Sequence, residues 1–395
     1  MREIRADARE RRSVDILVMV LVATVVLGFL IFIHEGGHYL ASRAFGVRVT
    51  EFMIGLPGPA LAFRVGETRF GVTAIPLGGY ARVCGMEAGE ESPHLQAVLA
   101  ALYVRGTANL EDIARDCGIT DDEAYDALEE LVEWGSCTGP QKTDEYNTYR
   151  AVAVSPTRRQ QKRAQAAART QYAGGAVEAP APVVLPSYEE GEARPVPNAA
   201  FLYESERARQ YRSLPFWKRT VILLAGIFMN LLFAMVAFVI IYSVIGFDYT
   251  FEDGTVQHVL IDPLRSIQAG FMYIGMVAQA VVNLFNPSTA VETVQNSTSI
   301  VGIAIMSKTA AEEGLVSLLS FTAMISVSLG IMNLLPIPPL DGGRFIIEIV
   351  QKISRRTMSA RVVNSLTVAG VVLFLGFFVL MVGQDVTRVF TGTFF

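Results

Sequence analysis

The chain has 395 residues, of which 51% are hydrophobic and 18% are charged, and its net charge is -5. Such a composition excludes a purely soluble protein and indicates a polytopic α-helical membrane protein with soluble portions. The negative net charge argues against a nucleic-acid-binding protein, so we expect no nucleic acid as a partner.

Residues 1–41 are predicted to hold an N-terminal arm and the first membrane span. For the charged arm we favour a solvated segment over a helix lying on the membrane surface. The run from Ile16 to Ile33 contains no ionisable residue, which indicates a span of membrane-crossing length ending near Ala41. The first apolar run is not followed by a small-residue cleavage site, so we do not expect it to be a removable signal peptide.

This span ends in the sequence His34-Glu35-Gly36-Gly37-His38. Two histidines four residues apart lie on one face of a helix, so both can bind one zinc ion. Glu35 lies beside them and could accept a proton from a zinc-bound water. A chance match or a structural histidine is the alternative, but ionisable groups near membrane depth are costly without a role. We therefore predict a zinc site with Glu35 as the catalytic base.

Residues 42–86 change to a two-residue period, which predicts a small membrane-associated β-sheet. We expect a strand over Val47–Ile54 and a hairpin made of Ala60–Val65 and Thr68–Ala74. An exposed edge of this sheet could hold a substrate in extended form by backbone pairing, as proteolysis requires. A plain soluble hairpin is the alternative, and the sequence does not separate the two.

Residues 87–155 resemble a winged helix-turn-helix domain. Helices are predicted at Leu95–Val104, Leu110–Cys117 and Asp121–Glu133, followed by a hairpin wing over Trp134–Val154. Thr120 and Glu123 form the pattern of a capping box. The third helix would read DNA in such a domain, but it carries many acids and no base, so it would repel phosphates. We therefore expect a cytoplasmic module that senses or binds a protein partner.

Residues 156–215 are predicted to be a linker, because their apolar content is too low for a packed core. Its basic start could contact anionic lipid headgroups, although a solvated run is the favoured interpretation. The three cysteines, Cys84, Cys117 and Cys137, are odd in number and lack CxxC spacing. They indicate reduced thiols on the cytoplasmic side of the membrane.

Residues 216–247 form the second predicted span, which contains Asn230. An amide at this depth commonly joins two helices by a hydrogen bond, which is the simplest role for Asn230. Residues 248–314 follow as an extracytoplasmic segment. Within it, Ser266–Phe285 is apolar but interrupted by polar residues, so we expect an interfacial or re-entrant amphipathic helix rather than a full span.

Residues 315–345 form the third predicted span, which three prolines interrupt just before Asp341. Unwound backbone at membrane depth is tolerated where it lines a cavity or lies against protein. Asp341 could therefore reach a metal held by another helix and complete a site of two histidines and one carboxylate, with a position left open for water. A capping aspartate at a helix end is the alternative. Residues 346–361 are a basic loop, and residues 362–395 hold the fourth span.

The distribution of charge predicts how the chain crosses the membrane. In residues 248–314 acids outnumber the basic Arg265 and Lys308, whereas the loop over 344–361 is basic. The positive-inside rule then places residues 42–219 and 344–361 in the cytoplasm. The arginines of the N-terminal arm would lie outside, which argues against this orientation, but we give more weight to the later loops.

Taken together, the zinc motif in the first span, Gly226 to Asn230 in the second and Asn333 to Gly343 in the third resemble the site-2 protease family of intramembrane zinc metalloproteases. Within this family the chain is most similar to the bacterial regulator of sigma-E proteases. The resemblance implies a four-span core with zinc bound by His34, His38 and Asp341, and with Glu35 as the base. It also implies that Asn333, and less directly Asn230, bind the substrate. Relatives carry PDZ domains between the second and third spans, for which residues 248–262 are too short; this chain instead carries the winged-helix-like insertion.

The resemblance further implies what the protein cuts. The expected substrates are single-span proteins of the bacterial cytoplasmic membrane, such as anti-sigma factors in stress signalling, already shortened outside by another protease. The alternative is an inert membrane sensor or scaffold that signals through the winged-helix-like module. The presence of both Glu35 and Asp341 argues against the inert protein.

Overall fold

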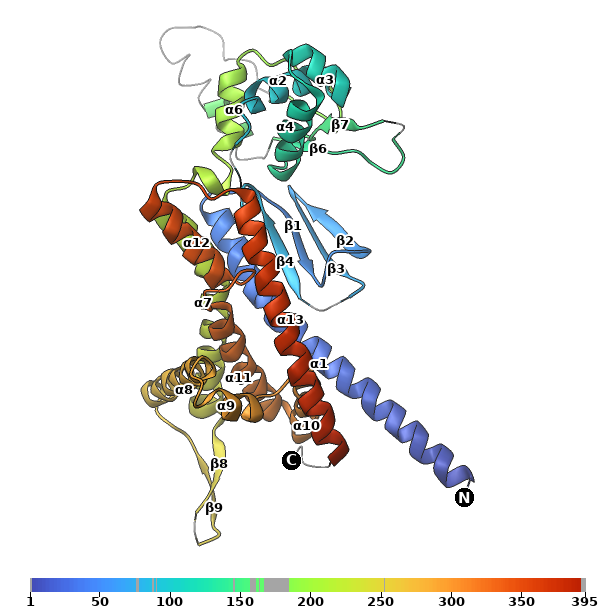
Figure 1. Cartoon of the computed structure of the whole chain (residues 1–395). Coiled ribbons are helices and arrows are strands. Elements are labelled where there is room, and N and C mark those ends of the chain that lie inside the picture. The colour runs from blue at the N-terminus through green and yellow to red at the C-terminus, as the bar shows by residue number, and fades with distance from the viewer. Residues whose placement is uncertain are drawn as a thin grey trace. The chain divides into compact units, whose positions relative to one another are not determined.

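The computed structural model describes residues 2–75, 78–86, 89, 91–144, 146–156, 161–162, 164–166, 185–251 and 253–391. The described chain divides into two compact units (Figure 1). The larger unit combines residues 1–83 with residues 214–395, and the smaller unit comprises residues 84–213. Part of the predicted linker, including residues 167–184, lies outside the described residues.

Helices make up most of the larger unit. Their bounds are α1 (Arg2–Ala44), α7 (Phe216–Val239), α8 (Pro263–Leu284), α9 (Ala290–Asn296), α10 (Ile300–Glu313), α11 (Leu315–Asn333), α12 (Asp341–Ser354) and α13 (Ala360–Thr391). A π-type turn over Ile240–Ile245 extends α7. The N-terminal arm is helical and continuous with the first span, since α1 begins at Arg2. At the centre α7 packs against both α1 and α11, so the segments that carry the zinc motif, Asn230 and Asn333 are neighbours.

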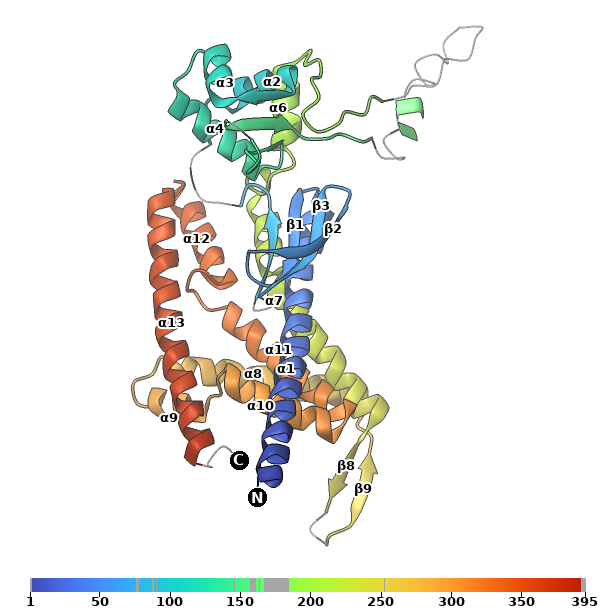
Figure 2. The same ribbon diagram turned by 90° about the vertical axis from the view of Figure 1, so that its right-hand side faces the viewer.

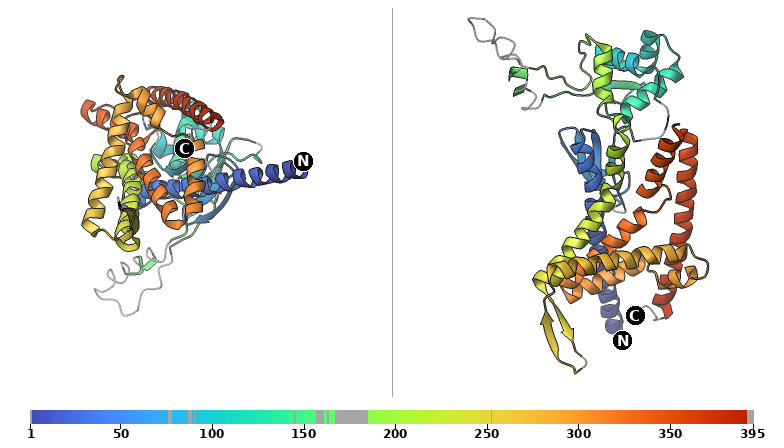
Figure 3. Two further views of the ribbon diagram at one scale, coloured as in Figure 1. Left: turned by 90° about the horizontal axis from the view of Figure 1, so that it is seen from below. Right: turned by 90° about the vertical axis from the view of Figure 1, so that its left-hand side faces the viewer.

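Five helices among the described residues are long and apolar enough to cross a membrane, whereas the sequence predicted four spans. Four of the five, which lie in α1, α7, α11 and α13, coincide with the predicted spans. The fifth is α8, predicted as an interfacial or re-entrant helix. It lies across α7 and α13 rather than along them (Figure 3). Its interfacial placement stays a prediction, because its length and composition alone would also allow a span.

A four-stranded sheet lies beside α1 in the larger unit (Figure 2). Its strands are β1 (Val49–Ile54), β2 (Ala60–Val65), β3 (Thr68–Thr73) and β4 (Gly79–Val83), in the order β2-β3-β1-β4. The predicted strand and hairpin are therefore present, with β1 parallel to β3 and antiparallel to β4. Strand β4 was not predicted, because its start at Gly78-Gly79 is typical of a loop. Gly79 lacks a side chain and can therefore lie against Ile31 of α1.

The smaller unit contains the helices and the wing in the predicted order. They are α2 (Leu95–Arg105), α3 (Leu110–Cys117), α4 (Asp121–Glu133), β5 (Thr107–Asn109), β6 (Cys137–Thr138) and β7 (Thr148–Ala151), with the strands in the order β5-β7-β6. The Thr120–Glu123 capping box is present at the start of α4. A buried cluster around Leu99, Leu128 and Trp134 joins the three helices. The assignment as a winged-helix domain stays our interpretation of this element order.

The smaller unit extends beyond the predicted boundary at residue 155. Tyr188 pairs with Val154, and the Arg194 guanidinium stacks over Tyr103. Helix α6 (Ala199–Arg207) then packs against α2. The described residues from 185 to 213 are thus part of the folded unit, not of a linker. The sequence did not indicate this, because the backbone pairing at Tyr188 and the stacking of Arg194 leave no periodic apolar pattern.

Candidate metal centre

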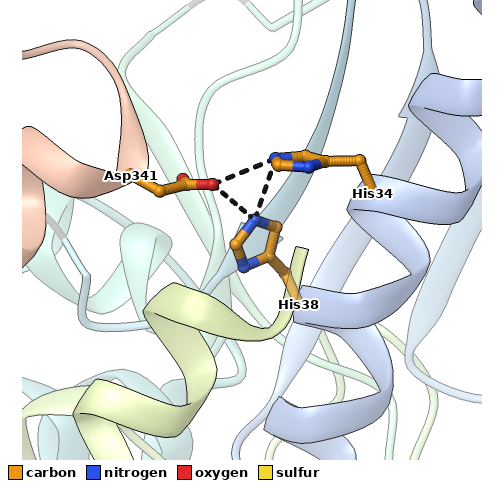
Figure 4. A group of neighbouring side chains, drawn as sticks. All are labelled: His34, His38 and Asp341. Carbon is orange, nitrogen blue, oxygen red and sulfur yellow. Dashed lines mark hydrogen bonds and ion pairs between the residues drawn. The ribbon is translucent and has the colours of Figure 1, made fainter. Parts of the chain in front are cut away.

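The two histidines of α1 meet at their Nε2 atoms, which lie 3.3 Å apart. Both side chains are almost fully buried, with 7% and 8% of their surfaces exposed. Their four-residue spacing places them on one face of α1, the face that packs against α7. Each imidazole therefore directs a ring nitrogen into the same small space (Figure 4).

Asp341 reaches this space from a distant part of the chain. Its Oδ2 lies 3.0 Å from His34 Nε2 and 3.2 Å from His38 Nε2. The aspartate is the first residue of α12, directly after the proline-interrupted segment that follows α11. Gly342 and Gly343 lie so close to the backbone of that segment that neither position has room for a Cβ atom. These glycines therefore hold the start of α12, and with it the carboxylate, against the segment.

Two hydrogen bonds orient the imidazoles from behind. His38 Nδ1 donates to the carbonyl oxygen of Ile222 in α7, at 2.8 Å. With its proton on Nδ1, His38 presents an unprotonated Nε2 to the centre, which is the form that binds a metal. His34 Nδ1 lies 3.2 Å from the side-chain amide of Asn230, whose side chain is completely buried.

The Asn230 amide carries a further constraint. Its nitrogen faces His34 Nδ1, whereas its oxygen is buried without a hydrogen-bond partner. If His34 presents an unprotonated Nε2 to a metal, its proton is on Nδ1 and needs an acceptor. A half-turn of the amide, which exchanges two atoms of nearly equal size, supplies that acceptor as Oδ1. Asn230 therefore fits as the residue that positions His34.

The donor set fits a zinc ion. One atom from each of His34, His38 and Asp341 can be chosen so that all lie within 4.8 Å of one another. Two imidazoles and one carboxylate are a ligand set typical of catalytic zinc, which leaves the fourth position open to water. The Asp341 Oδ2 atom is buried and accepts no hydrogen bond, as expected of an oxygen whose partner is a cation. A side chain at Gly226 would collide with both imidazoles, so this position requires glycine for the rings to fit.

Glu35 lies between the two histidines in sequence but makes a different contact. Its Oε2 accepts a hydrogen bond of 2.9 Å from the backbone N–H of Ala81 in β4. The carboxylate is thereby held at the sheet and is not one of the three atoms that converge on the centre. Glu35 thus lies beside the ligands rather than among them, and its role as the base stays a prediction.

The two asparagines predicted to bind substrate differ in how deeply they are buried. Asn333 is the last residue of α11 and is only partly buried, so a substrate could contact it as predicted. Asn230 was also predicted to bind substrate, but it is fully buried and contacts His34. The contacts of the Ile222 carbonyl and the Ala81 N–H could not be predicted, because backbone groups carry no residue-type signal.

Comparisons with known proteins agree with this geometry. The model of the family "Peptidase family M50" matches residues 22–377. The chain is similar to the "Regulator of sigma-W protease RasP" of Bacillus subtilis strain 168, with 23% identity covering 94% of this chain and 99% of RasP. It is also similar to the "Putative zinc metalloprotease SA1105" of Staphylococcus aureus strain N315, with 22% identity covering 95% and 99%. The match therefore covers the three ligands and Glu35.

Proposed function

The chain belongs to peptidase family M50, as an intramembrane zinc metalloprotease of a bacterial membrane, and we propose that it cleaves the transmembrane segments of single-span membrane proteins. The observation that carries the proposal is the convergence of His34, His38 and Asp341 within a bundle of apolar helices. A hydrolytic centre placed there can reach a peptide bond that lies in the bilayer. Anti-sigma-like substrates are the proposed class, since RasP is named for the regulation of a sigma factor.

We propose the following roles for the residues of the centre. Zinc, when bound, supplies a Lewis acid that favours ionisation of water and stabilises negative charge on a carbonyl oxygen. His34, His38 and Asp341 would hold it, with Ile222 and Asn230 fixing the two rings. Glu35 would accept the proton of the attacking water and return it to the leaving amine. Asn333 would hold the substrate backbone at the end of α11.

We further propose that the substrate pairs with the free edge of β4. The sheet has two edges, β2 and β4, and β4 packs against α1, with Gly79 next to Glu35. Gly55 N donates to Gly78 O, so the alternation of an antiparallel ladder directs the Ala81 N–H away from β1. That N–H already reaches the base. An extended chain added at this edge would therefore lie beside Glu35.

The substitution Ala81→Pro tests the β4 edge. Proline removes the outward N–H without breaking the β1–β4 ladder, as edge strands tolerate. We expect kcat/KM for a single-span substrate to fall by about tenfold or more, since one hydrogen bond to a charged or bound group contributes about 1.5–3 kcal/mol. The measurement is cleavage in detergent or vesicles, followed by gel analysis.

The matched control is Ala62→Pro on the opposite edge of the sheet. Ala74 N donates to Pro59 O, so Ala62 also has its N–H directed outward, in this case from β2. This variant carries the same substitution at the equivalent position and should cleave at the wild-type rate. Equal losses in the two variants would contradict a specific role for β4.

A second test concerns the positioning of His34. Asn230→Leu removes the acceptor for His34 Nδ1 and should weaken zinc binding by about 10–100-fold, as loss of an outer-shell partner does. Asn230→Asp retains an acceptor oxygen and should bind zinc within a few-fold of wild type. Competition with a chromogenic chelator measures both affinities. An equally large loss in the aspartate variant would refute the orientation assigned to the amide.

The substrate class itself is tested by trapping. A Glu35→Gln variant expressed in native membranes should retain single-span proteins that the active enzyme cuts, and cross-linking with mass spectrometry would identify them. The competing candidate is an inert sensor that signals through the smaller unit. Such a protein would capture no shortened single-span proteins and would carry no stoichiometric zinc.

A further inference from the structure

Helix α12, which begins with the metal ligand Asp341, presents an apolar stripe on its outer side. Ile346, Val350 and Ile353 are spaced four and three residues apart, so they lie on one face, and all three are exposed. The helix packs against α7, to which it is joined by an ion pair of 3.1 Å between Glu348 and Arg219. One side of α12 therefore packs against the bundle, and no described residue covers its apolar stripe.

A cluster of basic residues follows at the turn from α12 to α13. We call these residues the basic turn: Lys352, Arg355, Arg356 and Arg361. All four are exposed, and none takes part in an ion pair among the described residues. The sequence contains no acid between Glu348 and Asp385, so nothing nearby in the chain neutralises these charges.

The depth of this turn follows from the helices on either side. The long apolar helix α13 begins at Ala360, which places the basic turn where a span leaves the bilayer. The start of α7 gives an independent indication of the same depth. There Trp217 is 57% exposed, its ring lies 5.5 Å from that of Phe45, and Lys218 lies over both rings. Aromatic residues with a neighbouring cation are typical of the headgroup region, and Arg219, two residues later, binds α12.

We propose that α12 lies in the headgroup region of the bilayer and that the basic turn binds anionic phospholipid. The partner is identified by complementary chemistry: acyl chains for the apolar stripe and phosphate for four basic side chains. Juxtamembrane clusters of this size bind anionic lipid with about a fivefold gain per basic residue. The lipid site is independent of the proposed substrate class.

The position of Asp341 gives this site a consequence. The carboxylate belongs to the first residue of α12, whereas the two histidines belong to α1. A lipid that fixes α12 at the membrane surface therefore fixes one zinc ligand relative to the other two. Anionic lipid should accordingly slow the loss of zinc from the protein.

The test uses the full-length chain with Glu35→Gln, so that no proteolysis occurs, in nanodiscs of phosphatidylcholine with or without phosphatidylglycerol. Electron paramagnetic resonance of spin-labelled lipids measures the preference of the protein for phosphatidylglycerol over phosphatidylcholine. In the variant Lys352→Gln/Arg355→Gln/Arg356→Gln, the preference for phosphatidylglycerol should fall by at least about tenfold. The control Arg64→Gln/Lys142→Gln/Arg265→Gln removes the same charge at exposed positions elsewhere and should keep it.

Two further outcomes decide the proposal. Zinc release to a chelator should be slower in discs with phosphatidylglycerol for the parent chain, and independent of that lipid in the basic-turn variant. An unchanged lipid preference in that variant would overturn the site. A lost preference with unchanged zinc release would overturn the coupling to Asp341. Neither outcome depends on cleavage, so the proposed protease function is tested separately.

Discussion

Replacing Glu35 by glutamine is expected to lower the rate of peptide-bond hydrolysis by about 10²–10⁴-fold, the range attributed to a positioned general base. Zinc content should stay at the wild-type level, because the three atoms that converge on the centre belong to His34, His38 and Asp341. Glutamine retains an oxygen that can accept the Ala81 N–H bond, so the contact between α1 and β4 should persist. The substitution thus removes proton transfer and leaves the site otherwise intact.

Cleavage of a single-span substrate under single-turnover conditions gives the rate, and elemental analysis of the purified protein gives the zinc content. Glu51→Gln is the matched control, because Glu51 is a carboxylate of the neighbouring strand β1 that is bound by Tyr80 and arginines rather than by the centre. This control should cleave at nearly the wild-type rate. Hydrolysis within tenfold of wild type in the Glu35 variant would remove Glu35 from the role of base.

The metal centre was predictable because its ligands are marked by residue type. His34 and His38 are recognisable from their spacing alone, since a four-residue interval defines one face of a helix. Asp341 was recognisable because the prolines before it mark an unwound segment within an apolar run. Strong hydrophobic patterns likewise predicted the span helices, the β2–β3 hairpin and the helices of the smaller unit.

What escaped prediction depends on tertiary contact. β4 is short and begins with glycines, so its strand conformation comes from pairing with β1 and from the close approach of Gly79 to α1. The extent of the smaller unit depends on Arg194 stacking over Tyr103 and on a backbone pairing at Tyr188, and neither leaves a periodic pattern. The role of Asn230 depends on which neighbour its buried amide meets, and here the neighbour is His34.

Asp341→Ala is expected to weaken zinc binding by more than about 100-fold. Loss of a residue that only orients a metal ligand weakens binding by up to about 100-fold, and this substitution removes a ligand itself. The two histidines on α1 would remain, but a pair of imidazoles alone leaves a catalytic zinc without the carboxylate that completes its ligand set. Hydrolysis should fall with the zinc content, and added zinc should restore little of it. Chelator competition measures the affinity and the cleavage assay measures the activity.

The matched control is Asp385→Asn, which changes the fully buried aspartate of α13. Asp385 accepts hydrogen bonds from Ser299 and Gly302 at the start of α10, far from Asp341 in sequence and outside the ligand set. Its loss should therefore lower the thermal stability of the protein while zinc affinity stays near wild type. The Asp341 variant should instead lose zinc affinity, since its Oδ2 atom is buried without a hydrogen-bond partner and faces both histidines. Wild-type zinc affinity in Asp341→Ala would mean that the ion is held without this residue, and the joint site of α1 and α12 would have to be abandoned.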